Sequence, residues 1–126
     1  MAEQLRQGAP KNVSFSGFVP HEELLETYGK AKVYCQLSRY ESFGVALVEA
    51  MSCECVPVVT ECGALPEIVG DAGFSVPWED VQSTSTAIRQ ALRTPDGKKA
   101  RERARNMFSM EIRERGLVRI VDELIL

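Results

Sequence analysis

Apolar residues recur along this chain with two periods, one typical of strands and one typical of helices. Residues 12–19 and 32–38 are rich in β-branched and aromatic side chains, which is typical of strands. Residues 56–60 form a short, continuously apolar run, as found in strands that are covered on both faces. A further short strand is expected at residues 74–77. The pattern therefore predicts four strands.

Helical periodicity separates these strands. Leu24, Leu25 and Tyr28 fall on one face of residues 20–29, and the acidic residues of this segment crowd its first turns, where the helix dipole favours them. Further helices are expected at residues 43–51, 64–69, about 80–92, and from residue 98 to residue 126 with a weak point at Ser109. Strands that alternate with helices at short spacing indicate an α/β fold with a mainly parallel sheet flanked by helices.

Composition limits the class of protein. A chain of 126 residues is the size of one ordinary domain. Its 44% hydrophobic content and net charge of −3 are typical of a soluble globular protein, and the mild acidity argues against nucleic-acid binding. No apolar run approaches the roughly 18 residues of a membrane span, and the first residues show no secretory signal. We therefore expect a cytoplasmic protein without a transmembrane segment, and attachment to the membrane periphery stays open.

Cysteines and a basic stretch leave alternatives open. The compartment favours free thiols, and Cys53, Cys55 and Cys62 do not have a recognised zinc spacing. We interpret them as small apolar residues rather than metal ligands, so no metal is expected.

Residues 98–119 hold eight basic and three acidic side chains. A solvated helical face is the preferred interpretation, and a surface that binds a membrane or a partner is the alternative.

One carboxylate stands out in the segment 43–51. Every residue there is apolar or glycine except Glu49, and an ionised carboxylate in an apolar helix costs free energy unless it is paired or opens onto a polar cleft. A narrow exposed strip of the helix is the other explanation. Glu41 lies just before the same helix, where the dipole stabilises an acid whether or not it has a function.

The start of this helix is a candidate anion site. Ser42 is a good N-cap, so we expect the helix to open with the backbone N–H groups of Phe43, Gly44 and Val45. A glycine there lets a ligand approach the main chain. The loop would leave the carboxyl end of the strand at 32–38, the edge where ligands of open parallel sheets collect. The sequence therefore predicts a pocket for a phosphate at the helix tip and for hydroxyl-rich groups near the two glutamates.

These residues also carry a family resemblance. Glu41 and Glu49 form an E-x7-E pattern in "YESFGVALVEAM", which is preceded by "NVSFSGFVPHEELLETYGKAKVYCQLS" and followed by "CVPVVTECGALPEIVGDAGFSVP". This closely resembles the C-terminal, donor-binding half of retaining family 4 glycosyltransferases of the GT-B fold (glycosyl transferases group 1). The resemblance implies a Rossmann-like half that binds a UDP- or GDP-linked sugar, and metal-independent transfer to an acceptor with the anomeric configuration retained. The nucleotide sugar is then a substrate, and no cofactor is expected.

The resemblance also assigns roles to residues. It implies that Glu41 meets the transferred sugar as the catalytic-site carboxylate, and that Glu49 meets the ribose diol. It implies that the backbone of Phe43, Gly44 and Val45 meets the phosphate and sugar region. Gly63, which also matches the family, is expected to permit a tight turn beside the pocket.

The chain departs from the family in two places. Glu54 stands where the family normally has a glycine, which puts the usual tight helix end in question. The first two βα units, which carry an Arg and a Lys for the diphosphate, and the N-terminal acceptor-binding half have no counterpart in the sequence. In the usual strand order 3-2-1-4-5-6 the strand at 12–19 is the third, which leaves an open edge.

We therefore expect residues 1–126 to form a single partial Rossmann-like domain that is inactive in isolation, and an open sheet edge that favours homo-oligomers. A non-catalytic α/β module that keeps the fold for assembly or interaction is the alternative function. Of the remaining residues, His21 is interpreted as a surface residue at a helix start and Trp78 as a packing residue. A catalytic role for His21 and sugar stacking for Trp78 are the less favoured alternatives.

Overall fold

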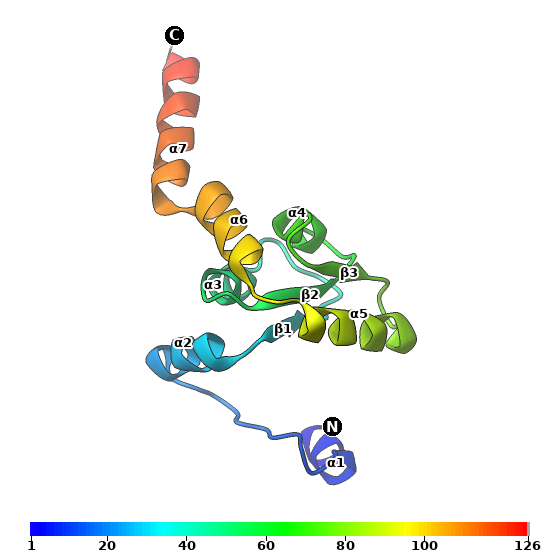
Figure 1. Ribbon diagram of the computed structural model, residues 1–126. Coiled ribbons are helices and arrows are strands. Elements are labelled where there is room, and N and C mark those ends of the chain that lie inside the picture. The colour runs from blue at the N-terminus through cyan, green and yellow to red at the C-terminus, as the bar shows by residue number, and fades with distance from the viewer. Residues whose placement is uncertain (126) are drawn as a thin grey trace.

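The computed structural model describes residues 1–125 and contains one parallel sheet. Its three strands, β1 (Val33–Gln36), β2 (Val56–Thr60) and β3 (Phe74–Val76), lie side by side in that order (Figure 1). Val33 pairs with Val56, and Val58 pairs with Phe74. Three of the four predicted strands and the mainly parallel α/β architecture are thereby confirmed.

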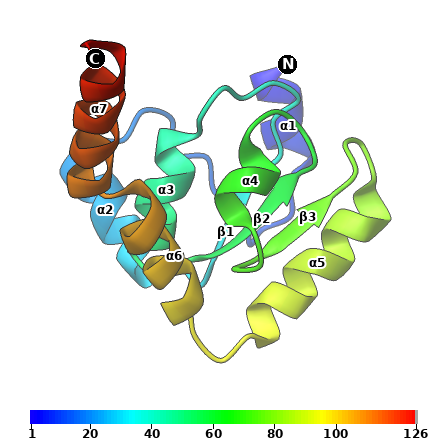
Figure 2. The same ribbon diagram turned by 90° about the horizontal axis from the view of Figure 1, so that it is seen from above.

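Helices cover both faces of this sheet. On one face, β2 packs with α3 (Val45–Ser52), α4 (Leu65–Val69) and α6 (Lys98–Phe108). The other face is covered by α5 (Val81–Arg93), which follows β3 (Figure 2). Successive side chains of a strand point to opposite faces, so Val58 joins the α5 side and Val59 joins the α3 side. All residues of β2 are buried, which explains its continuous apolar run.

The predicted strand at residues 12–19 is wrong. This segment pairs with no strand among the described residues, and Phe18 is 93% exposed. It links α1 (Ala2–Gly8), a short helix that the pattern does not predict, to α2 (His21–Lys30), and it runs clear of the sheet (Figure 1). A strand needs a neighbouring backbone for its N–H and C=O groups, and none lies beside this segment. β1 consequently has one unpaired edge.

The start of α3 also differs from the prediction. The helix begins at Val45, and its N-cap is Gly44 in the left-handed region (φ 82°) rather than Ser42. Gly44 adopts this conformation without the strain that a Cβ would add. Phe43 and Gly44 therefore belong to the turn that leads into the helix, and only Val45 of the three opens it.

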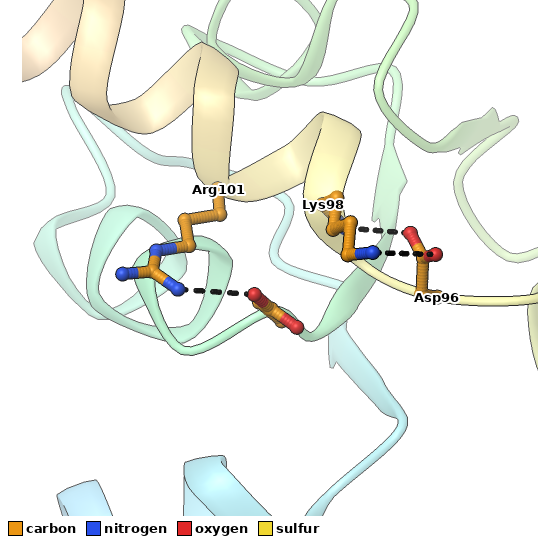
Figure 3. A network of polar contacts seen from close by, with 4 residues as sticks. Asp96, Lys98 and Arg101 are labelled. Carbon is orange, nitrogen blue, oxygen red and sulfur yellow. Dashed lines mark hydrogen bonds and ion pairs between the residues drawn. The ribbon is translucent and has the colours of Figure 1, made fainter.

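The end of α3 keeps a tight turn although it lacks the family's glycine. Glu54 itself adopts the left-handed conformation (φ 67°). The N–H of Glu54 donates to Met51 O (3.0 Å) and that of Cys55 to Ala50 O (3.0 Å), which is the Schellman pattern. Arg101 of α6 pairs with the Glu54 carboxylate at 3.1 Å (Figure 3). The doubt about this helix end is thus resolved: a glutamate replaces the glycine without opening the turn.

The two C-terminal helices meet at Ser109. α6 starts beside Asp96, whose carboxylate accepts from the N–H of Lys98 at 3.0 Å and faces its ammonium group at 3.8 Å (Figure 3). α7 (Met110–Ile125) begins after Ser109, whose extended backbone (ψ 155°) confirms the predicted weak point. α7 buries none of its described residues and projects away from the sheet (Figure 1). Residue 126, which the prediction included in this helix, lies outside the described residues.

The described helices show no membrane span. None of those within residues 1–125 combines the length and the apolar character that crossing a bilayer requires.

Candidate functional site

The Glu41 carboxylate lies between the end of β1 and the tip of α3. Its Oε2 accepts from Gln36 Nε2 at 2.8 Å, and its Oε1 accepts from the backbone N–H groups of Phe43 (3.3 Å) and Gly44 (3.1 Å). The turn before α3 thus binds a carboxylate, that of the chain's own Glu41. Two of the three N–H groups predicted to meet a phosphate are engaged by this carboxylate.

The loop after β2 packs against the backbone of Glu41. Gly63 has a left-handed backbone (φ 56°), and a Cβ there would collide with the carbonyl oxygen of Glu41. The N–H of the next residue, Ala64, donates to that same oxygen at 3.1 Å. Gly63 therefore lies in a turn beside Glu41, and its missing side chain is what allows the two loops to touch.

Glu49 lies half-buried on α3 and makes no hydrogen bond or ion pair with the residues that the structure describes. The partner that a carboxylate in an apolar helix needs is therefore not supplied by residues 1–125. Glu49 borders a hollow of about 570 Å³ between α3 and the junction of α6 with α7, which Phe43, Phe108 and Arg113 also line. Phe43 and Phe108 meet there edge to face, with ring centroids 5.8 Å apart.

Two tyrosines connect the surroundings of the two glutamates. The rings of Tyr28 (α2) and Tyr34 (β1) meet edge to face at 5.6 Å. Burial raises the pKa of Tyr34 to about 12, and the nearby Tyr28, Glu41 and Glu49 add to this effect. Burial also raises the pKa of Tyr28, followed by the charge of Glu49. The two tyrosines pack with Ala50, the residue after Glu49 in α3, and Tyr34 reaches Glu41 through Gln36. Both glutamates therefore lie on the α3 side of the sheet.

Sequence reasoning missed Gln36 and Tyr34. The Tyr34 hydroxyl donates to Gln36 Oε1 at 3.0 Å, and Gln36 in turn donates to Glu41. The available signal was the polar Gln36 at the end of an otherwise apolar strand segment, "VYCQL". A buried or half-buried amide needs hydrogen-bond partners, so a polar residue at this position should have been considered with Glu41.

Trp78 is 39% exposed, and Arg39 lies over its ring at 4.8 Å from the centroid. It borders a second hollow, of about 580 Å³, on the α5 side of the sheet. The ring thus faces a cation and a hollow instead of filling the core. His21 is exposed at the first position of α2, which agrees with its interpretation as a surface residue.

Cys53, Cys55 and Cys62 are free thiols, as is Cys35. The buried Cys55 donates to Tyr28 O at 3.2 Å, and burial raises the pKa of its thiol to about 11. Within residues 1–125, no group of three or more His, Cys, Asp or Glu side chains is placed to hold a metal ion.

Comparison with known proteins gives these residues a family. The sequence profile of the glycosyl transferases group 1 family matches residues 2–108. The chain is 40% identical over 80 residues to an O-antigen chain mannosyltransferase B of Escherichia coli, covering 64% of this chain and 21% of that protein. It is 39% identical over 59 residues to a phosphatidylinositol N-acetylglucosaminyltransferase GPI3 subunit of Saccharomyces cerevisiae, covering 47% and 13% of the two chains.

Comparison with solved structures also gives a glycosyltransferase-like fold. A sucrose-phosphate synthase from Thermosynechococcus elongatus superposes with a TM-score of 0.83 and 28% identity, over 98% of this chain and 33% of that one. The chain therefore spans about a third or less of the length of these relatives. The profile match over most of the chain and the shared fold lead to one conclusion: the chain belongs to the glycosyl transferases group 1 family.

Proposed function

We propose that this chain is the nucleotide-sugar-binding part of a retaining glycosyltransferase, from the C-terminal half of a GT-B enzyme of family 4. The relatives are named as mannosyl- and N-acetylglucosaminyltransferases, which favours transfer of a hexosyl group from a UDP- or GDP-linked donor. The observation that carries the proposal is the placement of Glu41 at the tip of α3 and of Glu49 on the same helix, where it borders the hollow of about 570 Å³.

Each glutamate has an environment suited to its proposed role. Glu49 has no partner among residues 1–125 and borders a hollow, so its carboxylate is free to accept the two hydroxyls of a ribose. Glu41 is anchored at both oxygens and would present its outer lone pairs to the transferred sugar. A donor phosphate would take over the N–H groups of Phe43 and Gly44, because backbone N–H groups at a helix tip favour anions.

We further propose that two βα units outside these 126 residues complete the domain. Within residues 1–125, β1 has an unpaired edge, and residues 12–19 have strand-like composition but no strand beside them. Two parallel strands inserted between β1 and residues 12–19 would provide hydrogen-bond partners for the backbones of both segments. In this proposal those units bring the basic residues for the diphosphate, and an N-terminal half brings the acceptor, so the 126 residues alone bind donor weakly and transfer no sugar.

Ligand-observed NMR tests the donor site without requiring activity. The purified chain is titrated with UDP, GDP, ADP, UDP-glucose and GDP-mannose, alongside Glu49→Ala and the matched control Glu22→Ala, which removes an exposed acid from α2. We expect saturation transfer from the wild type and from Glu22→Ala to ligands with one nucleotide base, and its loss in Glu49→Ala. Saturation transfer that survives in Glu49→Ala, or is absent for every nucleotide, contradicts the proposal.

A non-catalytic assembly module is the second candidate. The unpaired edge of β1 and the exposed apolar residues of α7, such as Leu117, Ile120 and Leu124, favour it, because open edges and apolar faces promote association. This candidate requires a dimer or larger oligomer in solution. Sedimentation at micromolar concentration that gives a mass near 14.0 kDa, the mass of one chain, would reject it.

A further inference from the structure

A continuous hydrogen-bonded path joins the core to the Glu41 carboxylate. The Tyr34 hydroxyl donates to Gln36 Oε1 (3.0 Å), and Gln36 Nε2 donates to Glu41 Oε2 (2.8 Å). A carboxylate can only accept, so Glu41 requires the NH₂ end of Gln36, and the amide oxygen of Gln36 then accepts from the Tyr34 hydroxyl. The path therefore fixes which end of Gln36 faces Glu41.

Both ends of this path are held by structure. Tyr34 and Gln36 are two residues apart in β1, so their side chains share the face that α3 covers. The Tyr34 ring is fixed against Tyr28, and its pKa of about 12 keeps the hydroxyl protonated at neutral pH. The hydroxyl therefore keeps the proton that it donates to Gln36, and Gln36 presents its NH₂ group toward the loop that carries Glu41.

We propose that Gln36 is a positioning residue that holds Glu41 for the sugar while the donor phosphate occupies the helix tip. This inference rests on the proposed donor site. Three donors reach the Glu41 carboxylate within residues 1–125, and two of them are the N–H groups of Phe43 and Gly44. An incoming phosphate competes for those two, whereas Gln36 lies on the strand side and bonds the other carboxylate oxygen. Gln36 is thus the contact that remains when the donor is bound.

Loss of the Gln36 side chain should affect binding of the nucleotide sugar more than binding of the nucleotide alone. In this arrangement Gln36 acts only through Glu41, and Glu41 meets only the transferred sugar. Gln36→Leu should therefore weaken binding of the nucleotide sugar by roughly tenfold, as expected for one hydrogen bond to a charged group. Binding of the matching nucleoside diphosphate should change by less than about twofold, since none of its contacts in the proposed site involves Gln36. Tyr34→Phe should show the same selectivity with a smaller loss.

The experiment measures dissociation constants by NMR titration for GDP with GDP-mannose and for UDP with UDP-glucose. The variants are Gln36→Leu, Tyr34→Phe and the control Gln90→Leu, which changes an exposed glutamine on α5 whose side chain has no partner within residues 1–125. Thermal unfolding verifies that each variant is folded. Equal weakening of nucleotide and nucleotide sugar, or no change in either, overturns the inference, because the first indicates a general structural role and the second no role.

The role of Gln36 can also be tested in the free protein. If the wild type binds none of the four ligands, the donor-site proposal fails, and the path is judged in the free protein. The amide resonances of Phe43 and Gly44 should then shift in Gln36→Leu and stay in place in Gln90→Leu, because losing one anchor moves the carboxylate that these N–H groups bind. Unchanged resonances in Gln36→Leu would overturn the positioning role itself.

Discussion

Replacing Gly63 by alanine tests how closely the loop after β2 must approach Glu41. The added Cβ would collide with the carbonyl oxygen of Glu41 and lie 3.1 and 3.2 Å from its carbonyl carbon and amide nitrogen. These are backbone atoms, and the same residue is anchored through its side chain to β1 and the tip of α3. The clash cannot be relieved by rotating a side chain, so the two loops must separate.

The magnitude follows from three costs and one gain. A left-handed backbone costs an alanine about 1–2 kcal/mol, and the steric overlap adds about 1–3 kcal/mol. Separation of the loops breaks the hydrogen bond from Ala64 N–H to Glu41 O, which is worth about 1 kcal/mol. Alanine also lowers the conformational entropy of the unfolded chain, which stabilises the folded state by about 0.4–1 kcal/mol. We expect Gly63→Ala to lower the free energy of unfolding by about 2–5.6 kcal/mol.

Gly17→Ala is the matched control. Gly17 also has a left-handed backbone (φ 64°), but a Cβ there meets no atom within 4 Å. Gly17→Ala retains the conformational penalty and lacks the clash, so it should lower the free energy of unfolding by about 0–1.6 kcal/mol. Urea unfolding followed by far-ultraviolet circular dichroism measures both variants. Free energies of unfolding that agree within about 0.5 kcal/mol would show that the contact between Gly63 and Glu41 is not closed in solution, and would refute the reasoning.

Two further predictions concern helix ends. Arg103 donates to two backbone carbonyls at the end of α4, at 2.6 Å each, so Arg103→Ala should lower the free energy of unfolding by about 1–3 kcal/mol. Arg105→Ala, an exposed neighbour on α6, should change it by less than about 0.5 kcal/mol; equal effects in urea titrations would contradict this role. Asp80 caps α5 by accepting from Ser83 N–H at 2.9 Å, and this bond lowers the pKa of Asp80 below its ordinary value of 3.8. Asp80→Ala should therefore lower the thermal midpoint, and this effect should be complete above pH 3.8. The difference from wild type should vanish as the pH falls through the lowered pKa, because the wild-type carboxylate is then protonated. A difference that does not depend on pH would contradict this role of Asp80.

The fold was predictable wherever the periodicity of a segment matched its final burial. β2 is buried along its whole length, and its sequence is continuously apolar, so pattern and structure agree. Residues 12–19 also have a strand-like composition, but no strand lies beside them in the part of the chain that the structure describes. Composition indicates that a segment can form a strand, but a strand also needs a neighbouring strand for its backbone hydrogen bonds. The prediction failed because composition does not show whether that neighbour is present.

The candidate site was predictable in its residues and less so in its geometry. Glu49 stood out because a single carboxylate in an apolar helix is costly, and the structure leaves it without a partner within residues 1–125. The start of α3 was misplaced because Ser42 has a strong N-cap preference. The Glu41 side chain, which is also able to cap, took the N–H groups instead. Gln36 bonds the other oxygen of the same carboxylate, and local sequence preferences do not reveal this contact across the strand end.

The stacking of Arg39 on Trp78 provides a built-in optical reporter. Trp78 is the single tryptophan of the chain, and Arg39 precedes Glu41 by two residues in the same loop. Any movement of this loop changes the charge above the indole ring, and indole emission responds to a nearby cation. The intrinsic fluorescence of the unlabelled protein therefore follows the conformation of the Glu41 loop in real time, from a position on the opposite face of the sheet that a ligand beside Glu49 would not cover.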